Sequence, residues 1–385
     1  MNPKFTIIKE TEFGRLGEIE TAHGTIQTPA FIFCGTKAAV KACSPDILKR
    51  TKTQIILSNT YHLLVYPGSE KIDELGGLQK MTAWNGPMMT DSGGYQIFSL
   101  GYGSVSQELK GIRNTKKTLV KIKEEGAKFK SYRDGKEIFL SPEGAMQAQI
   151  NFGADLIFAL DECTAFHIPK HETESSMERS QRWGVRCANY FNQNKKEHQG
   201  LYGIIQGGVY EDLRTKSIKY TNELDCFGIG VGGSLGKDIK DMKQVLEMIK
   251  AGCRKDRPKH LLGIGTIDAI LMAIPYGIDT FDCVYPTRLA RHGGALVRAH
   301  EKARYLNLNN SKFFNDSNPI DKSCACHTCK NFSRSYLHIL LKNDEQLALM
   351  ALTEHNICFM NNFMEEIRLA LLEETWQNFL YKWVI

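Results

Sequence analysis

Short apolar runs recur along the chain, separated by segments long enough for a helix. The eight runs cover residues 30–33, 55–57, 87–89, 156–160, 203–205, 227–231, 261–262 and 280–284. They show no alternation of polar and apolar positions, which is typical of parallel strands buried on both faces beneath crossover helices. Eight strands that alternate with helices predict an α/β fold, a TIM (β/α)8 barrel.

Helix signals agree with this pattern. The triplets Ser44-Pro45-Asp46 and Ser141-Pro142-Glu143 each offer a serine N-cap, a proline at the first helical position and an acidic first turn. Near the end of the chain, residues 346–385 are predicted to be mostly helical, with Trp376, Phe379 and Trp383 as packing side chains.

One large domain is expected. The 385 residues are 42% hydrophobic, and no linker-like stretch or internal repeat divides them. We therefore expect a single barrel domain over residues 1–385 with two additions. One is a basic insert at about 101–140 that favours short strands, and the other is a zinc-binding helical subdomain at about 315–385.

The positive charge is concentrated in the insert. The chain carries a net charge of +6, yet residues 110–136 alone hold ten basic and three acidic side chains, a net +7. Such a segment suits a phosphate backbone. The alternative is a solvated hairpin whose lysine-rich edges discourage aggregation.

Three cysteines within six residues indicate a metal site. Cys324, Cys326 and Cys329, with a later His or Cys as fourth ligand, fit tetrahedral zinc better than a disulfide framework. The other eight cysteines are scattered singly, as buried thiols are in a reducing cytosol. With no leader and no membrane-length apolar run, a cytoplasmic protein without membrane contact is expected.

Chemically capable residues follow the predicted strands. The segments at these strand ends are 91–95, 161–163, 206–208, 230–233, 263–265 and 282–287. Catalytic residues of TIM barrels come from this end of the strands. Carboxylates, an amide and glycine backbone are therefore expected to converge on one mouth.

Each carboxylate also has a structural interpretation. Asp91 and Asp161 can cap following helices, and Asp282, within an apolar run, can form an ion pair with Arg288. Two carboxylates across a pocket suit substitution at a sugar's anomeric carbon. A metal-dependent hydrolase is the competing enzyme class, but strand-end histidines are scarce and His62 stands nearly alone.

The motifs together resemble the tRNA-guanine transglycosylases, also called queuine tRNA-ribosyltransferases, of bacterial type. The resemblance rests on segments 91–96, 161–164, 203–207 and 281–288 and on the CxCxxC motif followed by His355, and it runs from about Gly14 to about His355. It implies an enzyme of queuosine biosynthesis that exchanges the wobble guanine of tRNAs for Asp, Asn, His and Tyr. The incoming base would be a 7-substituted 7-deazaguanine, either the aminomethyl precursor or queuine, and guanine would be released.

The resemblance also assigns roles by position. Asp282 would be the nucleophile in a double displacement through a covalent enzyme–RNA intermediate, and Asp91 the general acid/base. Substrate-binding positions would be Ser92, Gly93, Gly94, Tyr95, Asp161, Gln206 and Gly233, with Tyr95 stacking on the base. Contacts to the tRNA anticodon stem-loop, with the wobble base flipped out, would come from Gly263, Ile264, Gly265, Thr266, Ile267, Asp268, Ala269, Thr287, Arg288, Leu289, Ala290 and Arg291.

One structural zinc ion per chain would be held by Cys324, Cys326, Cys329 and His355. Spacing alone leaves His327, His338 and Cys358 open as the fourth ligand. The family's bacterial members are homodimers, so a homodimer is expected. A non-catalytic accessory tRNA-binding subunit of the same family is the alternative, against which the presence of both aspartates argues.

The chain departs from the bacterial pattern in two places. Residues 232–237 form a loop one residue shorter than usual, with Lys237 near the position of an acid that favours the cationic aminomethyl base. This loop favours a hypothesis that queuine is tolerated or preferred. Leu289 stands where a polar residue is common, which weakens that single tRNA contact.

Overall fold

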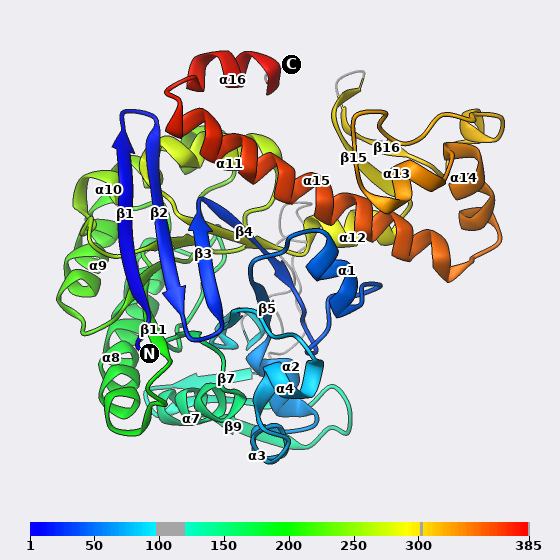
Figure 1. The fold of residues 1–385 in the computed structure, drawn as a ribbon. Coiled ribbons are helices and arrows are strands. Elements are labelled where there is room, and N and C mark those ends of the chain that lie inside the picture. Colours follow the sequence, from blue (N-terminus) through cyan, green and yellow to red (C-terminus); the bar gives the residue numbers. More distant parts are fainter. Residues whose placement is uncertain (98–119, 301–302, 384–385) are drawn as a thin grey trace.

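Eight parallel strands close into a barrel, which confirms the predicted fold class (Figure 1). The computed structural model describes residues 1–97, 120–300 and 303–383. In chain order the barrel strands are β4 (Ala30–Cys34), β5 (Ile56–Ser58), β6 (Met88–Thr90), β10 (Leu156–Phe158), β11 (Gly200–Ile205), β12 (Gly228–Val231), β13 (Lys259–Leu261) and β14 (Thr280–Cys283). Each lies within or beside one of the eight apolar runs, and β14 pairs with β4 to close the ring.

Helices cover the outside of the barrel. They are α1 (Pro45–Arg50), α2 (Thr60–Val65), α3 (Ser69–Glu74), α4 (Gly77–Thr82), α7 (Pro142–Phe152), α8 (Lys170–Asn194), α9 (Glu211–Glu223), α10 (Ile239–Gly252), α11 (Ile267–Ala273) and α12 (Tyr285–Arg291), with a 3-10 turn η1 (Ile274–Tyr276). Both predicted serine caps are confirmed. Ser44 accepts a hydrogen bond from the N–H of Ile47, and Ser141 accepts one from the N–H of Gly144.

An N-terminal antiparallel sheet that the apolar runs did not predict covers the amino-terminal ends of the barrel strands. It consists of β1 (Lys4–Thr11), β2 (Gly14–Thr21) and β3 (Gly24–Thr28). Ile19 and Ile26 on this sheet are fully buried in one cluster with barrel residues such as Ile32 and Met89. Burial of these side chains makes the sheet part of the barrel's core.

The insert forms strands, as expected. β7 (Val120–Lys123), β8 (Gly126–Lys130) and β9 (Glu137–Leu140) build a three-stranded antiparallel sheet. Phe129 on this sheet is buried against the main core, whereas Lys121, Lys123, Lys128 and Lys130 are solvent-accessible. Residues 98–119, which include four of the ten basic residues of the insert, lie outside the described residues.

A subdomain projects from the side of the barrel after the last barrel strand (Figure 1). It comprises a hairpin of β15 (Gly294–His300) and β16 (Ala303–Asn307), a 3-10 turn η2 (Ser311–Phe313), α13 (His327–Asn331) and α14 (Arg334–Lys342). The long helix α15 (Gln346–Leu372) joins the subdomain to the barrel, and α16 (Trp376–Trp383) follows. The helical tail and its packing tryptophans are confirmed, since Trp376 and Trp383 are buried; the hairpin was not predicted. Among the described helices none has the length and apolar character needed to cross a membrane.

A buried ion pair attaches the N-terminal sheet to the barrel. The guanidinium of Arg15 on β2 donates to both carboxylate oxygens of Asp279, at 2.9 and 2.5 Å, and both side chains are almost fully buried. Asp279 also accepts from the N–H of Lys259 at the start of β13. Each charge is therefore satisfied only while the sheet and the barrel remain in contact.

Replacing Arg15 with Leu is expected to lower the free energy of unfolding by about 3–5 kcal/mol, because it leaves the Asp279 carboxylate buried without its counter-ion. Urea unfolding followed by circular dichroism measures the loss. The matched control is Lys71→Ala, which removes the exposed pair with Glu74 and is expected to leave the midpoint unchanged. Equal midpoints for both variants would contradict the role given to the buried pair.

Candidate functional site

The structure gathers the predicted chemical groups at the carboxyl ends of the barrel strands, here called the barrel mouth. Asp91 directly follows β6, Asp161 follows β10, Gln206 follows β11, Gly233 follows β12, and Asp282 lies on β14. Parallel strands deliver their carboxyl ends to the same face of a barrel, so these groups converge although the sequence separates them.

Asp282 is held through one of its two carboxylate oxygens. Oδ1 accepts a hydrogen bond from the N–H of Gly263 at 2.9 Å and lies 3.1 Å from Nε2 of His260. Oδ2 faces the Cys34 thiol, whose sulfur is 3.5 Å away. These neighbours, and not Arg288, surround the carboxylate, so the ion-pair interpretation is wrong.

Asp91 is half-buried and carries a raised pKa. Burial is the largest cause and brings the pKa to about 7, helped by the charge of Asp282 and opposed by hydrogen bonds. Its carboxylate accepts from the N–H groups of Thr60 at 2.9 Å and Gly93 at 3.2 Å, and from the Asn59 amide. Asp91 therefore caps the turn that follows it, which agrees with the capping interpretation of this residue. Its carboxyl group also lies within electrostatic range of Asp282.

Asp161 belongs to a hydrogen-bonded network of polar side chains. It accepts from the Ser92 hydroxyl at 3.0 Å and from the Gln206 amide at 2.5 Å. Burial raises its pKa to about 6, against the lowering effect of these bonds. A Cβ at Gly94 would lie 2.4 Å from the Asp161 carbonyl oxygen, so only glycine permits this approach.

The buried side chain of Arg214 hydrogen-bonds to the loop after β12. The guanidinium of Arg214 donates to the carbonyl oxygens of Gly208, at 2.6 Å, and Ser234, at 3.0 Å, and burial lowers its pKa to about 10. Gly233 in this loop has a φ of 71°, and a Cβ there would lie 2.4 Å from Gln206 Oε1. Glycine is therefore required both for the backbone conformation and for the contact.

The predicted RNA-contacting segments divide by exposure. Gly263, Thr266, Asp268 and Arg288 are exposed, and Ile264, Ala269, Leu289 and Arg291 are half-buried. Gly265, Ile267, Thr287 and Ala290 are buried, which leaves their side chains no direct route to a ligand. Two exposed groups are already engaged: the Gly263 N–H binds Asp282, and Asp268 pairs with Arg304.

Several residues of the mouth were missed by the sequence analysis. Asn59 and Thr60 follow β5 and bind Asp91, and His260 on β13 lies beside Asp282. Asn59 and Thr60 stand at a strand end, so the rule that selected Asp91 and Asp161 applied to them equally. His260 gave no such signal, because it lies inside its strand.

A second cluster lies in the projecting subdomain. Cys324, Cys326, Cys329 and His355 bring their ligand atoms within 4.8 Å of one another, the one such group found among the described residues. The three sulfurs lie 3.8, 3.7 and 3.3 Å from His355 Nδ1. A tetrahedral zinc ion requires about 3.6 Å between sulfur and nitrogen ligands, so these donors fit the metal.

The structure selects His355 among the candidate fourth ligands. Its Nε2 lies 2.8 Å from the Leu296 carbonyl oxygen, which directs Nδ1, unprotonated, toward the thiols. His338 instead binds the Leu308 carbonyl, and His327 lies beside the Asn331 amide. Cys358, one turn beyond His355 on α15, is outside the four-residue group.

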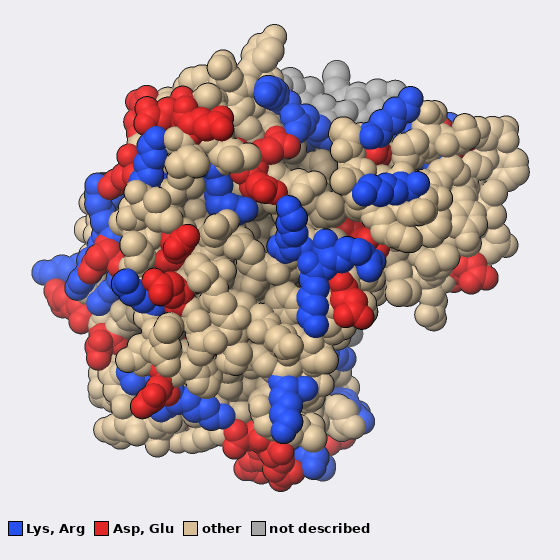
Figure 2. Space-filling model, in the orientation of Figure 1, with Lys and Arg blue, Asp and Glu red and all other residues tan. Residues whose placement is uncertain are grey.

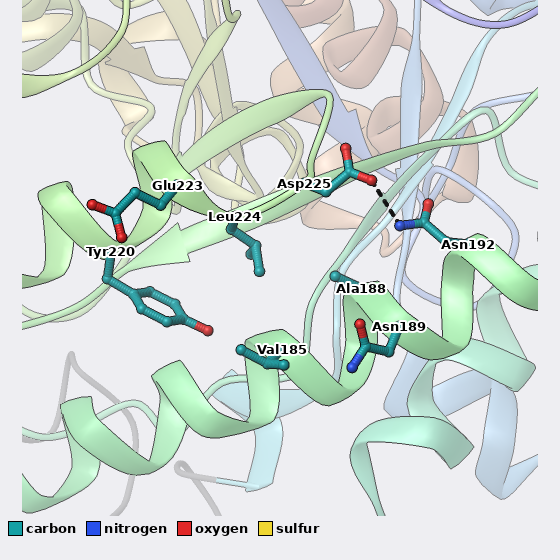
Figure 3. Close-up of a pocket in the computed structure, with 8 residues that line it drawn as sticks. All are labelled: Val185, Ala188, Asn189, Asn192, Tyr220, Glu223, Leu224 and Asp225. Atoms are coloured by element: carbon teal, nitrogen blue, oxygen red, sulfur yellow. Dashed lines mark hydrogen bonds between the residues drawn. The ribbon is translucent and has the colours of Figure 1, made fainter.

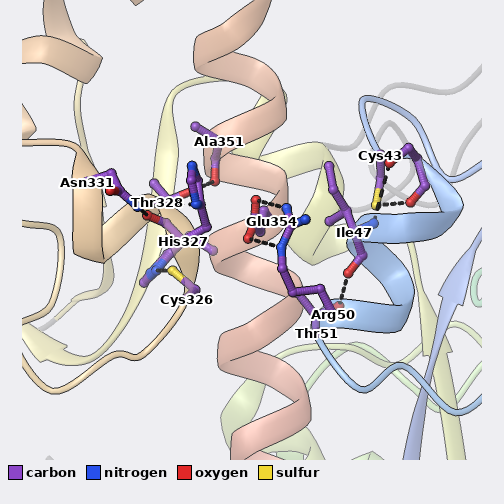
Figure 4. Close-up of polar contacts among 12 residues, drawn as sticks. Cys43, Ile47, Arg50, Thr51, Cys326, His327, Thr328, Asn331, Ala351 and Glu354 are labelled. Atoms are coloured by element: carbon purple, nitrogen blue, oxygen red, sulfur yellow. Dashed lines mark hydrogen bonds and ion pairs between the residues drawn. The ribbon is translucent and has the colours of Figure 1, made fainter.

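Helix α15 connects this cluster to the barrel (Figure 4). Glu354, beside His355, forms a paired contact with Arg50 of α1 at 2.9 and 3.2 Å. The Asn356 side chain binds the Leu296 N–H and the carbonyl oxygens of Pro286 and Gly294. A metal ion held by His355 would thus also stabilise the backbone that follows Asp282.

A surface pocket of about 250 Å³ lies apart from the mouth, between α8 and α9 (Figure 3). Val185, Ala188 and Leu224 contribute to its lining, and the Asp225 carboxylate accepts a hydrogen bond from Asn192 at 2.8 Å. It contains none of the residues predicted for the site, so we assign it no part in the chemistry.

A closed (β/α)8 barrel with carboxylates at its mouth defines the class of protein, a TIM-barrel enzyme. A family model described as queuine tRNA-ribosyltransferase matches residues 10–384. The chain is 40% identical to the queuine tRNA-ribosyltransferase of Roseiflexus sp. (strain RS-1) over 96% of both chains, and 41% identical to that of Bacillus subtilis (strain 168) over 96% of this chain and 92% of the relative. The chain therefore belongs to the queuine tRNA-ribosyltransferase family and is a pentosyltransferase.

The purified protein is expected to carry one metal ion per chain, measured by atomic emission. Cys326→Ser is expected to lose most of that metal, because it removes one of four ligands. Cys358→Ser is the control, since it changes a neighbouring thiol outside the group and is expected to retain the metal. Metal loss in the control, or full retention in Cys326→Ser, would show the ligand set to be wrong.

Proposed function

We propose that this enzyme is a tRNA-guanine transglycosylase of queuosine biosynthesis. It exchanges the wobble guanine of tRNAs for Asp, Asn, His and Tyr for a 7-substituted 7-deazaguanine by double displacement. The observation that carries the proposal is a pair of electrostatically coupled carboxylates, the half-buried Asp91 and the buried Asp282, in unlike surroundings at the mouth. Unlike surroundings are what assign different roles to two carboxylates.

Asp282 is the nucleophile. A carboxylate oxygen donates an electron pair to the ribose anomeric carbon, the bond from that carbon to N9 of guanine breaks, and the bonding pair leaves on the purine. Asp91, with a pKa of about 7, supplies the proton that neutralises the departing guanine. The resulting carboxylate of Asp91 takes a proton from the incoming base, which attacks the same carbon and displaces Asp282.

The network around Asp161 reads the base. Its carboxylate offers acceptors beside the Gln206 amide, to which it is hydrogen-bonded, and the Gly233 backbone lies close to Gln206. Tyr95 is 44% exposed in the helical segment after β6 and provides a ring for stacking. Ser92 fixes Asp161, and Gly94 brings its backbone close to Asp161. Gly93 donates its N–H to the Asp91 carboxylate.

A basic and aromatic surface beside the mouth supports tRNA as the partner. Tyr66 and Tyr132 are 59% and 51% exposed, and the Arg133 guanidinium and the Lys37 ammonium lie over their rings at 3.6 and 5.1 Å. His62 links this surface to the Asp91 loop, because it follows Asn59 on α2 and its ring contacts Tyr132. Unstacked bases and phosphates are the ligands for such rings and cations.

On the face of the molecule that Figure 2 shows, acidic and basic side chains are less separated from one another. Figure 2 shows acidic and basic side chains interspersed over the barrel helices, with basic side chains gathered near the junction with the projecting subdomain. One of the cations in this region, Arg50 on α1, is paired with Glu354. The surface beside the mouth is therefore the better candidate for the anticodon stem-loop, with the wobble base flipped into the barrel.

The short loop at residues 232–237 bears on the incoming base. Lys237 is exposed, so its charge does not argue against the cationic aminomethyl base, whereas Leu235 packs against the core and Gly236 has a φ of 99°. A short, glycine-bearing loop that itself holds no acid suits the larger cyclopentenediol substituent of queuine. We infer that queuine is tolerated or preferred.

The remaining assignments follow from the same family. The metal is one structural zinc ion, because four protein ligands leave no open coordination position. We infer a homodimer that works in the cytoplasm, where its eleven free thiols remain reduced. An accessory, non-catalytic subunit is disfavoured by the hydrogen-bonded geometry around both aspartates.

Guanine release is expected to depend on pH through Asp91. Its pKa lies above the usual value, so the protonated acid is abundant below about pH 7 and is lost as the pH rises through that value. Single-turnover release of labelled guanine from tRNA should then be constant at low pH and fall about tenfold per unit well above pH 7. A rate that stays constant from pH 6 to 9 would exclude Asp91 as the acid.

The proposed activity is tested by incorporation of labelled guanine into tRNA that carries an unmodified wobble guanine. Wild-type protein is expected to incorporate the label, and Asp282→Asn to lose turnover by at least about a thousandfold, because the amide is a poor nucleophile. Queuine and the aminomethyl precursor serve as separate competitors. Better competition by queuine supports the inference on the loop, and better competition by the precursor would overturn it.

Absence of incorporation with tRNA still bound would overturn the transglycosylase assignment and favour an accessory subunit. Retained turnover in Asp282→Asn would move the nucleophile to another residue. The control protein for both assays is Lys71→Ala, an exposed substitution on α3 whose side chain pairs with Glu74 and with no residue of the mouth.

A further inference from the structure

His260 is a fully buried ionisable side chain to which the chemistry above gives no role. It lies in the middle of β13, between Gly230 of β12 and Thr280 of β14, and its ring packs against Phe158 at 5.4 Å between ring centroids. A buried imidazole costs free energy unless its nitrogens find partners. Both nitrogens do.

The two hydrogen bonds define the proton positions. Nδ1 lies 2.9 Å from the Thr280 hydroxyl, and Nε2 lies 3.1 Å from Oδ1 of Asp282. An ionised carboxylate only accepts hydrogen bonds, so Nε2 carries a proton and donates it. The Thr280 hydroxyl, which can donate to or accept from Nδ1, fixes the ring's orientation.

The Asp282 carboxylate is therefore held asymmetrically. Oδ1 receives two donors, the imidazole of His260 and the N–H of Gly263, from β13 and from the loop after it. Among the residues that the structure describes, the one hydrogen-bond donor to Oδ2 is the weak Cys34 thiol, at 3.5 Å. Lone pairs of Oδ1 that point at donors are withdrawn from reaction, while those of Oδ2 remain available.

We propose that His260 is a positioning residue for the nucleophile: with Gly263 it anchors Oδ1, so that Oδ2 is the oxygen that attacks the anomeric carbon. The inference rests on the proposed role of Asp282. As the bond from Oδ2 to the carbon forms and the bond to N9 breaks, Oδ1 becomes the carbonyl oxygen of the glycosyl ester. It keeps the same two donors, so the carboxylate needs no rotation in either displacement.

Two amide substitutions at position 260 test this role. The nitrogen of a glutamine side chain reaches the place of imidazole Nε2, whereas the shorter asparagine amide matches Nδ1 and stops at Thr280. His260→Gln is expected to keep most of kcat for guanine exchange. His260→Asn is expected to lose about ten- to a hundredfold in kcat, the cost of one hydrogen bond to a charged group, with the KM for tRNA unchanged.

The test depends on the difference in kcat between His260→Gln and His260→Asn, because both variants place an amide in the same buried position. Equal kcat values for His260→Gln and His260→Asn, or a loss confined to the KM for tRNA, would overturn the positioning role. Thermal unfolding of both proteins checks that they fold. If both are destabilised and inactive, the role is likewise refuted, because rescue by the longer amide has failed.

The oxygen assignment has its own test. A structure of wild-type protein trapped with tRNA in the absence of an incoming base is expected to show Oδ2, on the Cys34 side, bonded to the ribose, and Oδ1 still at hydrogen-bonding distance from Gly263. A bond to the oxygen beside Gly263 would overturn the inference. Asp282→Asn distinguishes failure of the proposed function from failure of the positioning role of His260. If Asp282→Asn retains turnover, the proposed function fails. If Asp282→Asn is inactive while His260→Asn is fully active, only the positioning role fails.

Discussion

Closure of the barrel between β14 and β4 is the constraint on which the rest of the molecule depends. That pairing sets Asp282 opposite Ile32 and makes the last strand a neighbour of the first. Since all eight strands run parallel, one end of the ring collects Asp91, Asp161 and Asp282, and the other end requires a cover. The N-terminal sheet provides that cover, anchored by the buried pair of Arg15 and Asp279. The carboxyl ends of the barrel strands therefore carry the candidate chemical groups, and their amino ends carry the covering sheet that stabilises the fold.

Features could be predicted from the sequence where a few consecutive residues carry the pattern that defines them. The eight strands, the serine caps and the thiol cluster each lie in a few consecutive residues, so their patterns predicted them. The N-terminal sheet was missed because strands buried on one face carry a weaker pattern than the continuous apolar runs of the barrel. The support of the carboxylates was also missed: Thr60 and His260 reach their partners only across neighbouring strands, and a backbone donor such as the Gly263 N–H has no sequence signature.

The two carboxylates of the mouth are differentiated by what surrounds them. Desolvation of the half-buried Asp91 carboxyl raises its pKa to about 7, helped by the charge of Asp282 and opposed by three hydrogen bonds. Asp282 is anchored by donors on a single oxygen. A site built this way keeps one carboxyl able to carry a proton near neutral pH while it orients the other. Neutralising Asp282 by ester formation removes a charge that helps to raise the pKa of Asp91. In the proposed reaction, ester formation at Asp282 would thus lower the pKa of Asp91 at the moment when Asp91 must give up its proton.

Three consecutive residues of α15 carry the influence of the thiol cluster to this site. Glu354 binds Arg50 of α1, His355 faces the thiols and binds the Leu296 carbonyl oxygen, and Asn356 binds the carbonyl oxygen of Pro286 in α12. Successive helical residues point in different directions, so one helix can reach three elements at once. A metal held by His355 would therefore fix the rotation of α15 about its own axis, and through Asn356 the position of α12, which begins three residues after Asp282. None of the four residues of the thiol cluster lies at the mouth, yet the backbone beyond the proposed nucleophile is held by the same helix that carries His355.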